Sequence, residues 1–323
     1  MYAAIHCQEI CWEVGEVNID DLVPRSGGNL MFSLLRLRSS KVSRQLSTAV
    51  LSFEQFGNTD APKKAVFIHG VLGSKKNMRT PCKQFTKLFP EYSCITVDLR
   101  GHGSSHSFNE DNTMEGCAHD LNKLFVDKTP DFVCAHSLGG KVALKYIELL
   151  VKQHRTLPQN TWILDSLPGL YTFEDSADDS QSVKKVIEAL DHIPMVFESR
   201  RWVVEELVNK GIALSIAQWL STSVIDTPEG CRWAFDLPVV KDLFRNFCET
   251  NMWPFLEEYD KDYPIHFVRA GRQKKWTDSV LSQFSEIERR NNAVKVHTML
   301  DVGHWLHSED LPGLLKIITE HNK

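Results

Sequence analysis

The amino-acid sequence predicts an α/β fold: a mostly parallel central sheet with helices on both faces and a helical segment inserted between two strands. From residue 51 onward, short apolar runs alternate with segments whose apolar residues recur at helical spacing. Residues 167–260 break this rhythm with helical patterns alone, and a strand pattern restarts at residue 264. Strands that alternate with helices form a parallel sheet, so the interruption is expected to be an insertion into one sheet.

Five strands and three helices are predicted before the insertion. Apolar runs bounded by glycine, proline or polar residues predict strands at 51–57, 63–70, 93–101, 131–137 and 160–165. Helical spacing of apolar residues predicts helices at 77–89, 114–127 and 138–154. Because parallel strands need crossover connections of this kind, we expect helices to cover both faces of the sheet.

The insertion and the residues after it complete the predicted organisation. Helical patterns occupy 183–191, 199–220 and 236–258, and they are followed by strands at 264–271 and 293–299 and a helix at 308–321. We therefore predict a core of residues 51–166 and 261–323, with residues 167–260 as a helical cap. The insertion holds four of the eight tryptophans, Trp202, Trp219, Trp233 and Trp253. A cap that closes over a site has little core of its own, so some of these rings are expected to line an apolar pocket.

Composition and charge argue against two classes of protein. The 323 residues include 37 Lys and Arg against 42 Asp and Glu, a formal net charge of −5. Without a basic excess to neutralise phosphates, we expect no nucleic-acid partner. The longest apolar stretches are about seven residues, far short of the roughly 20 that cross a bilayer, so we expect no transmembrane segment. The eight cysteines form no CxxC pair and several lie in apolar runs, so we expect reduced thiols.

The first fifty residues differ from the rest and are predicted to be an N-terminal extension. Residues 31–50 carry four basic residues and five serines, lack acidic residues and begin with Met31. This composition is typical of an amphipathic import presequence, which predicts a mitochondrial or other organellar location. The alternative is a solvated basic linker in a cytoplasmic protein. We expect residues 1–50 to be mostly disordered or removed.

The sequence VCAHSLGG, residues 133–140, places Ser137 between a predicted strand and a predicted helix. Ala135 and Gly139, two residues before and after the serine, are small, as a tight strand-to-helix turn requires where backbones approach closely. Such a turn lifts the hydroxyl above the sheet and places the N–H of Leu138 beside it at the helix N-terminus. We predict Ser137 as a nucleophile.

The sequence HGVLGS, residues 69–74, directly follows a predicted buried strand. Acyl transfer needs two converging N–H donors for the oxyanion, and one of them must come from outside the serine turn. The backbone N–H of Val71 is therefore the predicted second donor beside that of Leu138. Further along the chain, DLRGHGSS (98–105) is interpreted as a brace for the neighbouring loop, through charge-assisted hydrogen bonds of Asp98 and its neighbours.

The sequence DVGHWLH, residues 301–307, places His304 in a glycine-bearing loop between the last predicted strand and the last helix. A general base for a serine must titrate near neutral pH, which is the property of histidine. Of the thirteen histidines, His304 alone follows the final strand, where the chain order serine, acid, histidine requires the base. We predict His304 as that base.

The acid that would orient the base is less well marked. Its commonest position is three residues after the glycine that closes the strand following the insertion, but the residue there is Lys274. Asp165 is the favoured candidate, because it ends the predicted strand 160–165 and would lie at the carboxyl edge of the sheet near the histidine. Asp278 is the alternative acid, although its setting in WTDSV is typical of a helix N-cap.

Taken together, these motifs resemble the alpha/beta-hydrolase-fold serine hydrolases over residues 51–323. HGxxGS, DLRGHGSS, AHSLGG and GHW occur in the order and spacing of that family. LDSLPG after the strand 160–165, with no acid after the next strand, resembles the branch of the mitochondrial alpha/beta-hydrolase-domain-containing protein eleven and small bacterial esterases. The resemblance implies esterase or thioesterase activity and an acid after the sixth strand of the fold. The triad that it implies is Ser137, Asp165 and His304.

The sequence thus predicts a hydrolase of carboxylic esters or thioesters that needs no metal or cofactor. Its partner is expected to be a small-molecule substrate with a hydrophobic acyl group. One alternative is a ligand-binding or interaction protein on a hydrolase scaffold, because a fold does not fix a function. The other is a carbon–carbon bond hydrolase that uses the same triad.

Overall fold

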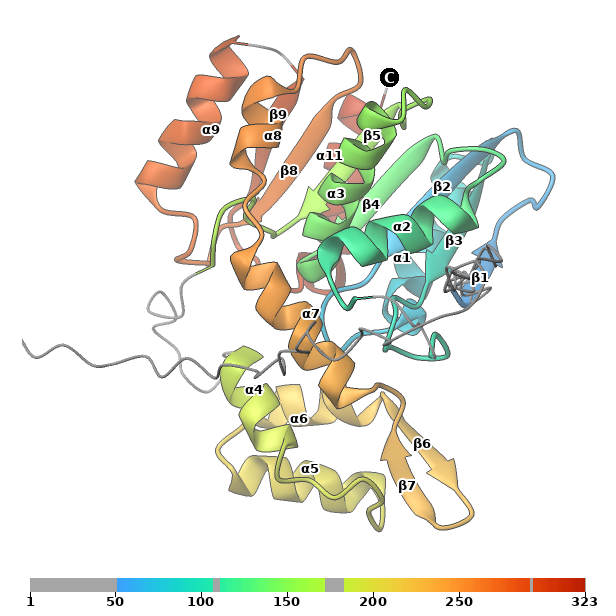
Figure 1. Ribbon diagram of the computed structural model, residues 1–323, viewed down its shortest axis with the longest axis vertical. Coiled ribbons are helices and arrows are strands. Elements are labelled where there is room, and N and C mark those ends of the chain that lie inside the picture. Colours follow the sequence, from blue (N-terminus) through green and yellow to red (C-terminus); the bar gives the residue numbers. More distant parts are fainter. Residues whose placement is uncertain (1–50, 107–110, 172–182, 291–292, 323) are drawn as a thin grey trace, which may run out of the picture. The chain divides into compact units, whose positions relative to one another are not determined.

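In a computed structural model of the chain, seven strands form a central sheet in the order β1–β3–β2–β4–β5–β8–β9 (Figure 1). These strands are β1 (Phe53–Phe56), β2 (Lys63–Ile68), β3 (Tyr92–Val97), β4 (Phe132–His136), β5 (Asn160–Leu164), β8 (Ile265–Ala270) and β9 (Val294–Met299). β1 runs antiparallel to β3, and every other neighbouring pair is parallel. The predicted mostly parallel sheet is confirmed.

The structure describes residues 51–106, 111–171, 183–290 and 293–322. The chain divides into two units, Met1–Gln45 and Leu46–Lys323, and every described residue belongs to the second unit. The predictions for residues 1–50, which include the presequence at 31–50, lie outside the described residues, as do the first two cysteines. The described cysteines are free thiols: Cys82, Cys94, Cys117, Cys134, Cys231 and Cys248.

Helices cover both faces of the sheet, as predicted. The helical elements around it are η2 (Lys75–Met78, a 3₁₀ turn), α1 (Arg79–Leu88), α2 (Met114–Leu124), α3 (Leu138–Lys152), α9 (Asp278–Arg290), α10 (Leu306–Glu309) and α11 (Leu311–His321). Successive strand residues point to opposite faces. Val66 and Ile68 of β2 therefore pack in the cluster of α2 and α3, whereas Ala65 and Phe67 pack in that of α1 and α11. None of the described helices is long and apolar enough to cross a bilayer.

The segment between β5 and β8, here called the insertion, is not purely helical. Its described elements are α4 (Val183–Leu190), α5 (Arg200–Asn209), α6 (Leu214–Ser221), β6 (Val224–Thr227), β7 (Gly230–Trp233), α7 (Leu237–Glu249) and α8 (Trp253–Glu258). The prediction of helices alone was wrong, because β6 and β7 pair as an antiparallel hairpin. The sequences of β6 and β7, VIDT and GCRW, lack a clear alternation of apolar and polar residues. The helix predicted over 199–220 also breaks, at Gly211, whose φ of 82° suits a helix end.

Lys141 of α3 links the sheet domain to the insertion through hydrogen bonds of its buried side chain. Its side chain is fully buried, and Nζ donates hydrogen bonds to the carbonyl oxygens of Gly169 (2.6 Å), Phe247 (2.7 Å) and Thr250 (2.8 Å). The last two carbonyls belong to the C-terminus of α7, where they lack partners within the helix. A positively charged ammonium group at that end also interacts favourably with the negative end of the helix dipole.

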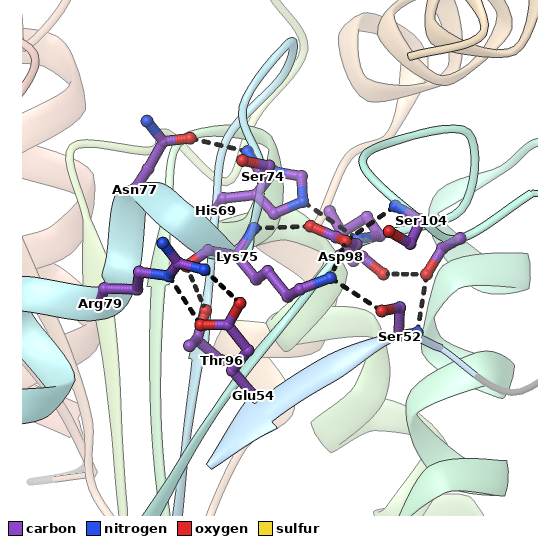
Figure 2. Close-up of polar contacts among 12 residues, drawn as sticks. Ser52, Glu54, His69, Ser74, Lys75, Asn77, Arg79, Thr96, Asp98 and Ser104 are labelled. Atoms are coloured by element: carbon purple, nitrogen blue, oxygen red, sulfur yellow. Dashed lines mark hydrogen bonds and ion pairs between the residues drawn. The ribbon is translucent and has the colours of Figure 1, made fainter. Parts of the chain in front are cut away.

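Asp98, at the end of β3, braces the loop that follows β2 (Figure 2). Its carboxylate accepts hydrogen bonds from the backbone N–H of Lys75 (2.7 Å), from Lys75 Nζ (2.6 Å) and from the N–H of Ser104 (2.9 Å). Burial alone would raise the pKa of Asp98, but His69, Lys75 and Ser104 outweigh burial and hold the pKa below its ordinary value. The carboxylate is thus ionised and joins two loops beside the sheet edge, as the brace interpretation of DLRGHGSS predicted.

We expect Asp98→Asn to lower the free energy of unfolding at pH 7 by about 2–4 kcal/mol, because an amide cannot accept from three donors at once. A carboxyl with a lowered pKa in the folded state stabilises the protein above the unfolded-state pKa, and this stabilisation is lost as pH falls through the folded-state pKa. The deficit of the variant should therefore shrink below about pH 4. Urea unfolding across this pH range measures it, with the exposed Asp60→Asn as control. A deficit of equal size at all pH values would contradict the role assigned to the carboxylate.

We expect Lys141→Met to cost about 2–4 kcal/mol of unfolding free energy, because three buried carbonyl groups lose their shared donor. Burial lowers the pKa of Lys141 to about 7, so the measurement is made at pH 6, where the ammonium is charged. Lys145→Met is the matched control: Lys145 lies one turn later in α3 and forms a partly exposed ion pair with Glu148, and pairs that water can reach contribute about 0–1 kcal/mol. Equal unfolding midpoints for the two variants would refute the anchoring role.

Candidate active site

Ser137 lies in a sharp turn between β4 and α3. Its backbone has φ 53° and ψ −121°, a conformation that strains any residue other than glycine. Gly139 has to be glycine, because a Cβ there would lie 2.5 Å from the carbonyl oxygen of His69. The strand–turn–helix predicted around VCAHSLGG is therefore present, and the turn is strained.

The structure brings Ser137, His304 and Asp165 together in one chain of hydrogen bonds. Nε2 of His304 lies 3.2 Å from Oγ of Ser137, and Nδ1 of His304 lies 2.6 Å from Oδ2 of Asp165. The sheet explains why Ser137 and Asp165 lie close together. The residues that precede them, His136 and Leu164, are register partners in the neighbouring strands β4 and β5. With Nδ1 donating to the carboxylate, Nε2 is free to accept the serine proton.

Asp165 is a fully buried carboxylate with four donors around it. Oδ1 accepts from Nε1 of Trp276 (2.6 Å) and from the N–H of Ala270 (3.2 Å), whereas Oδ2 faces His304 and Nζ of Lys275 (2.9 Å). Burial by itself would raise the pKa of Asp165, but Lys275 and His304 outweigh burial and hold the pKa well below its ordinary value. The side chain is therefore an anion that can orient a histidine ring.

Asp278, the alternative acid, lies elsewhere. It is the exposed first residue of α9, and the Nδ1 atom of His304 faces Asp165 instead. The side chain of Thr277 accepts from the N–H of Val280, so Thr277 rather than Asp278 caps the helix. The structure thus leaves Asp165 as the carboxylate that contacts His304.

Two residues that contact this carboxylate were missed from the sequence. Lys275 and Trp276 directly follow Lys274, which occupies the commonest position of the acid in the sequence pattern. In the sequence they are only a lysine and a tryptophan in a predicted loop. A lysine in a loop is usually solvated, and a tryptophan is usually part of the core, so neither indicates a site. Only their contact with Asp165 gives them a place in the site.

Burial lowers the pKa of His304, and the nearby ammonium of Lys275 lowers it further, whereas the hydrogen bond to Asp165 acts in the opposite direction. The net pKa lies below the ordinary value for histidine. The imidazole is therefore neutral at pH 7, which is the form that can accept a proton. His136, at the end of β4, supports the loop by donating from Nε2 to the backbone oxygen of His304 at 2.8 Å.

Two backbone N–H groups lie near the serine turn. Leu138 is the first residue of α3, so its N–H has no partner within the helix. Val71 lies in the loop after β2, next to Gly70, where an added Cβ atom would lie 3.0 Å from Cβ of Ser137. Within the described ranges, neither N–H group donates a backbone hydrogen bond outside regular helices and strands. Leu138 and Val71 are therefore the candidate backbone donors near Ser137.

The insertion contacts the loops that follow β9 and β3. Trp219 of α6 packs against Trp305, the neighbour of His304, with ring centroids 5.8 Å apart. The N–H of Asp236 donates to the carbonyl oxygen of Gly101 at 2.8 Å.

Across the described residues, no group of three or more His, Cys, Asp or Glu side chains is arranged to hold a metal ion.

Comparison with known proteins identifies the family of the chain. A model of the alpha/beta hydrolase family matches residues 65–313. The mouse sn-1-specific diacylglycerol lipase ABHD11 is 25% identical over 284 residues, which cover 87% of this chain and 88% of the mouse protein. Esterase YbfF of Escherichia coli K12 is 23% identical over 274 residues, which cover 79% of this chain and 91% of that protein.

A solved structure of a marine microorganism esterase superposes with a TM-score of 0.68 at 20% sequence identity, and the match covers 84% of this chain and 99% of that one. At this level of identity the likeness concerns the fold. The predicted alpha/beta-hydrolase fold and the resemblance to esterase relatives are confirmed. Because the family model spans most of the sequence, the chain belongs to the alpha/beta hydrolase family.

Proposed function

We propose that the protein is a serine hydrolase that cleaves carboxylic esters or thioesters through an acyl-enzyme. The observation that carries the proposal is the chain of contacts from Asp165 through His304 to Ser137, 2.6 Å and 3.2 Å long. It ends on a serine in a strained turn near two candidate backbone donors. Esterase and lipase relatives support ester hydrolysis as the general reaction.

The geometry supports the following first half-reaction. Nε2 of His304 accepts the proton from Ser137 as Oγ attacks the acyl carbonyl carbon, and Asp165 stabilises the imidazolium that forms. The carbonyl oxygen becomes an oxyanion, which the N–H groups of Val71 and Leu138 would stabilise as hydrogen-bond donors. His304 then gives the proton to the departing alcohol or thiol, which leaves the acyl group on Ser137.

In the second half-reaction, water replaces the leaving group. Nε2 of His304 accepts a proton from the water as its oxygen attacks the acyl carbonyl carbon. A second tetrahedral oxyanion forms in the same place, and its collapse releases the carboxylic acid while His304 returns the proton to Oγ of Ser137. Ser137 supplies the nucleophile and His304 transfers the protons, while Asp165 stays ionised throughout.

The insertion supports an apolar acyl group as the substrate class. Residues 167–260 are proposed as a cap, because Trp219 reaches the ring of Trp305 beside His304. Phe197, Trp233 and Phe235 form a further aromatic cluster in the same segment. The mouse relative is named for hydrolysis of a diacylglycerol, an ester with apolar acyl chains, which agrees with this class.

We expect Ser137→Ala and Asp165→Asn each to reduce kcat/KM by about 10³-fold or more, because one removes the nucleophile and the other the group that orients the base. Asp278→Asn is the matched control and should retain the activity of the wild-type protein. The measurement is a series of p-nitrophenyl esters from acetate to palmitate. The preferred chain length then reports the size of the acyl site.

A serine-directed phosphonate tests the nucleophile independently of the substrate. Wild-type protein should be labelled on Ser137, and Ser137→Ala should not be labelled. Absence of labelling in the wild-type protein would favour a ligand-binding protein on the hydrolase scaffold. Labelling combined with turnover of a diketone but not of esters would favour a carbon–carbon bond hydrolase.

A further inference from the structure

The ammonium of Lys275 shares an oxygen of Asp165 with the imidazole of His304. Nζ lies 2.9 Å from Oδ2 of Asp165, the same atom that accepts from Nδ1 of His304 at 2.6 Å. Nζ also donates to the backbone oxygen of Asp165 at 2.9 Å and lies 3.5 Å from Nδ1. Since Nζ and Nδ1 both donate, their approach reflects one shared acceptor rather than a hydrogen bond between them.

The position of Lys275 is largely screened from water. Its side chain is 15% exposed, and the side chain of its partner Asp165 is fully buried. Charges in such a setting interact more strongly than they do at an open surface. Asp165 also has φ 45°, a strained backbone conformation that persists only where surrounding contacts hold it. The second hydrogen bond of Lys275, to the backbone oxygen of Asp165, is one such contact.

The other titratable groups that face His304 come from two elements. His136 at the end of β4 and His307 of α10 both have a pKa lowered by burial, that of His307 to about 4, so both rings are neutral near pH 7. Glu309 of α10 is ion-paired with Arg272 and also accepts from the N–H of Gly303. The charges in direct contact with His304 are therefore the carboxylate of Asp165 and the ammonium of Lys275.

We propose that Lys275 is a positioning residue that shares Oδ2 of Asp165 with His304 and weakens the affinity of His304 for a proton. The inference rests on the proposed function, in which His304 is the base. An imidazolium would meet the ammonium across 3.5 Å and would share its counter-ion with it. The neutral ring carries no such repulsion, so Lys275 favours the form that accepts the proton of Ser137.

The consequence is activity that persists at mildly acidic pH. The acid limb of kcat/KM against pH reports the ionisation of the free base, here His304. Removing a nearby cation raises the proton affinity of the imidazole, so the limb should move to higher pH. A neighbouring charge commonly shifts such a midpoint by about one unit or more.

The test compares Lys275→Met with the matched variant Lys274→Met, whose lysine is exposed and adjacent in the chain. We expect the midpoint of the acid limb to rise by about one pH unit in Lys275→Met, a tenfold gain in proton affinity, and to stay in place in Lys274→Met. Lys275→Arg, which keeps the charge, should restore the wild-type midpoint. A purely structural role would lower kcat/KM evenly at all pH values without moving the limb.

A second measurement keeps the inference testable where Lys275→Met turns over too little substrate. The Cε1–H signal of His304, assigned with His304→Gln, is followed by NMR over the same pH range in wild-type protein and in Lys275→Met, with near-ultraviolet circular dichroism as the check on folding. The expected result is a higher midpoint in the variant, and an unchanged or lower midpoint overturns the inference. Failure of the proposed function would instead appear as full esterase activity in Ser137→Ala, whatever the titration of His304 shows.

Discussion

The buried carboxylate of Asp165 organises the residues around it into a site. An unpaired carboxylate in a fully buried position would cost several kcal/mol, so its surroundings must supply donors and positive charge. They come from the last residue of β8, from the loop after β8 and from the loop after β9. The partners of this one anion thus hold the end of β8 and the loops after β8 and β9 close together.

The sheet makes this convergence possible. β4, β5, β8 and β9 are consecutive neighbours and run in parallel, so their carboxyl ends meet at one edge. Ser137 and Asp165 each follow one member of a register pair, which sets their separation before any side chain is considered. The loop after β9 then brings His304 between them. Strained backbone at Ser137 and Asp165 agrees with a site held in place by the sheet around it.

Two further buried charged side chains, Asp98 and Lys141, also have several hydrogen-bond partners from distant parts of the chain. Asp98 collects three donors and joins the loop after β2 to the loop after β3. Lys141 gives three hydrogen bonds to carbonyl groups and joins the serine-bearing helix to the insertion. In each case the side chain of a single residue links segments that are distant in sequence. The geometry around Ser137 is therefore supported from the loop that carries Val71 and from the insertion.

Features that depend on residues close together in the chain could be predicted from the sequence. The parallel sheet, the helices on both faces and the turn at Ser137 follow from local apolar patterns and from small residues at fixed offsets. The hairpin of β6 and β7 was missed because its strands, VIDT and GCRW, do not alternate clearly between apolar and polar residues. Which carboxylate contacts His304 is visible only in the folded chain, since Asp165 and Asp278 were both compatible with the sequence. The same is true of the position of Lys275, which lies 110 residues from Asp165 along the chain. Ion pairs between such distant residues leave no periodic signal, because their energy depends on burial and distance, and only the folded chain sets both.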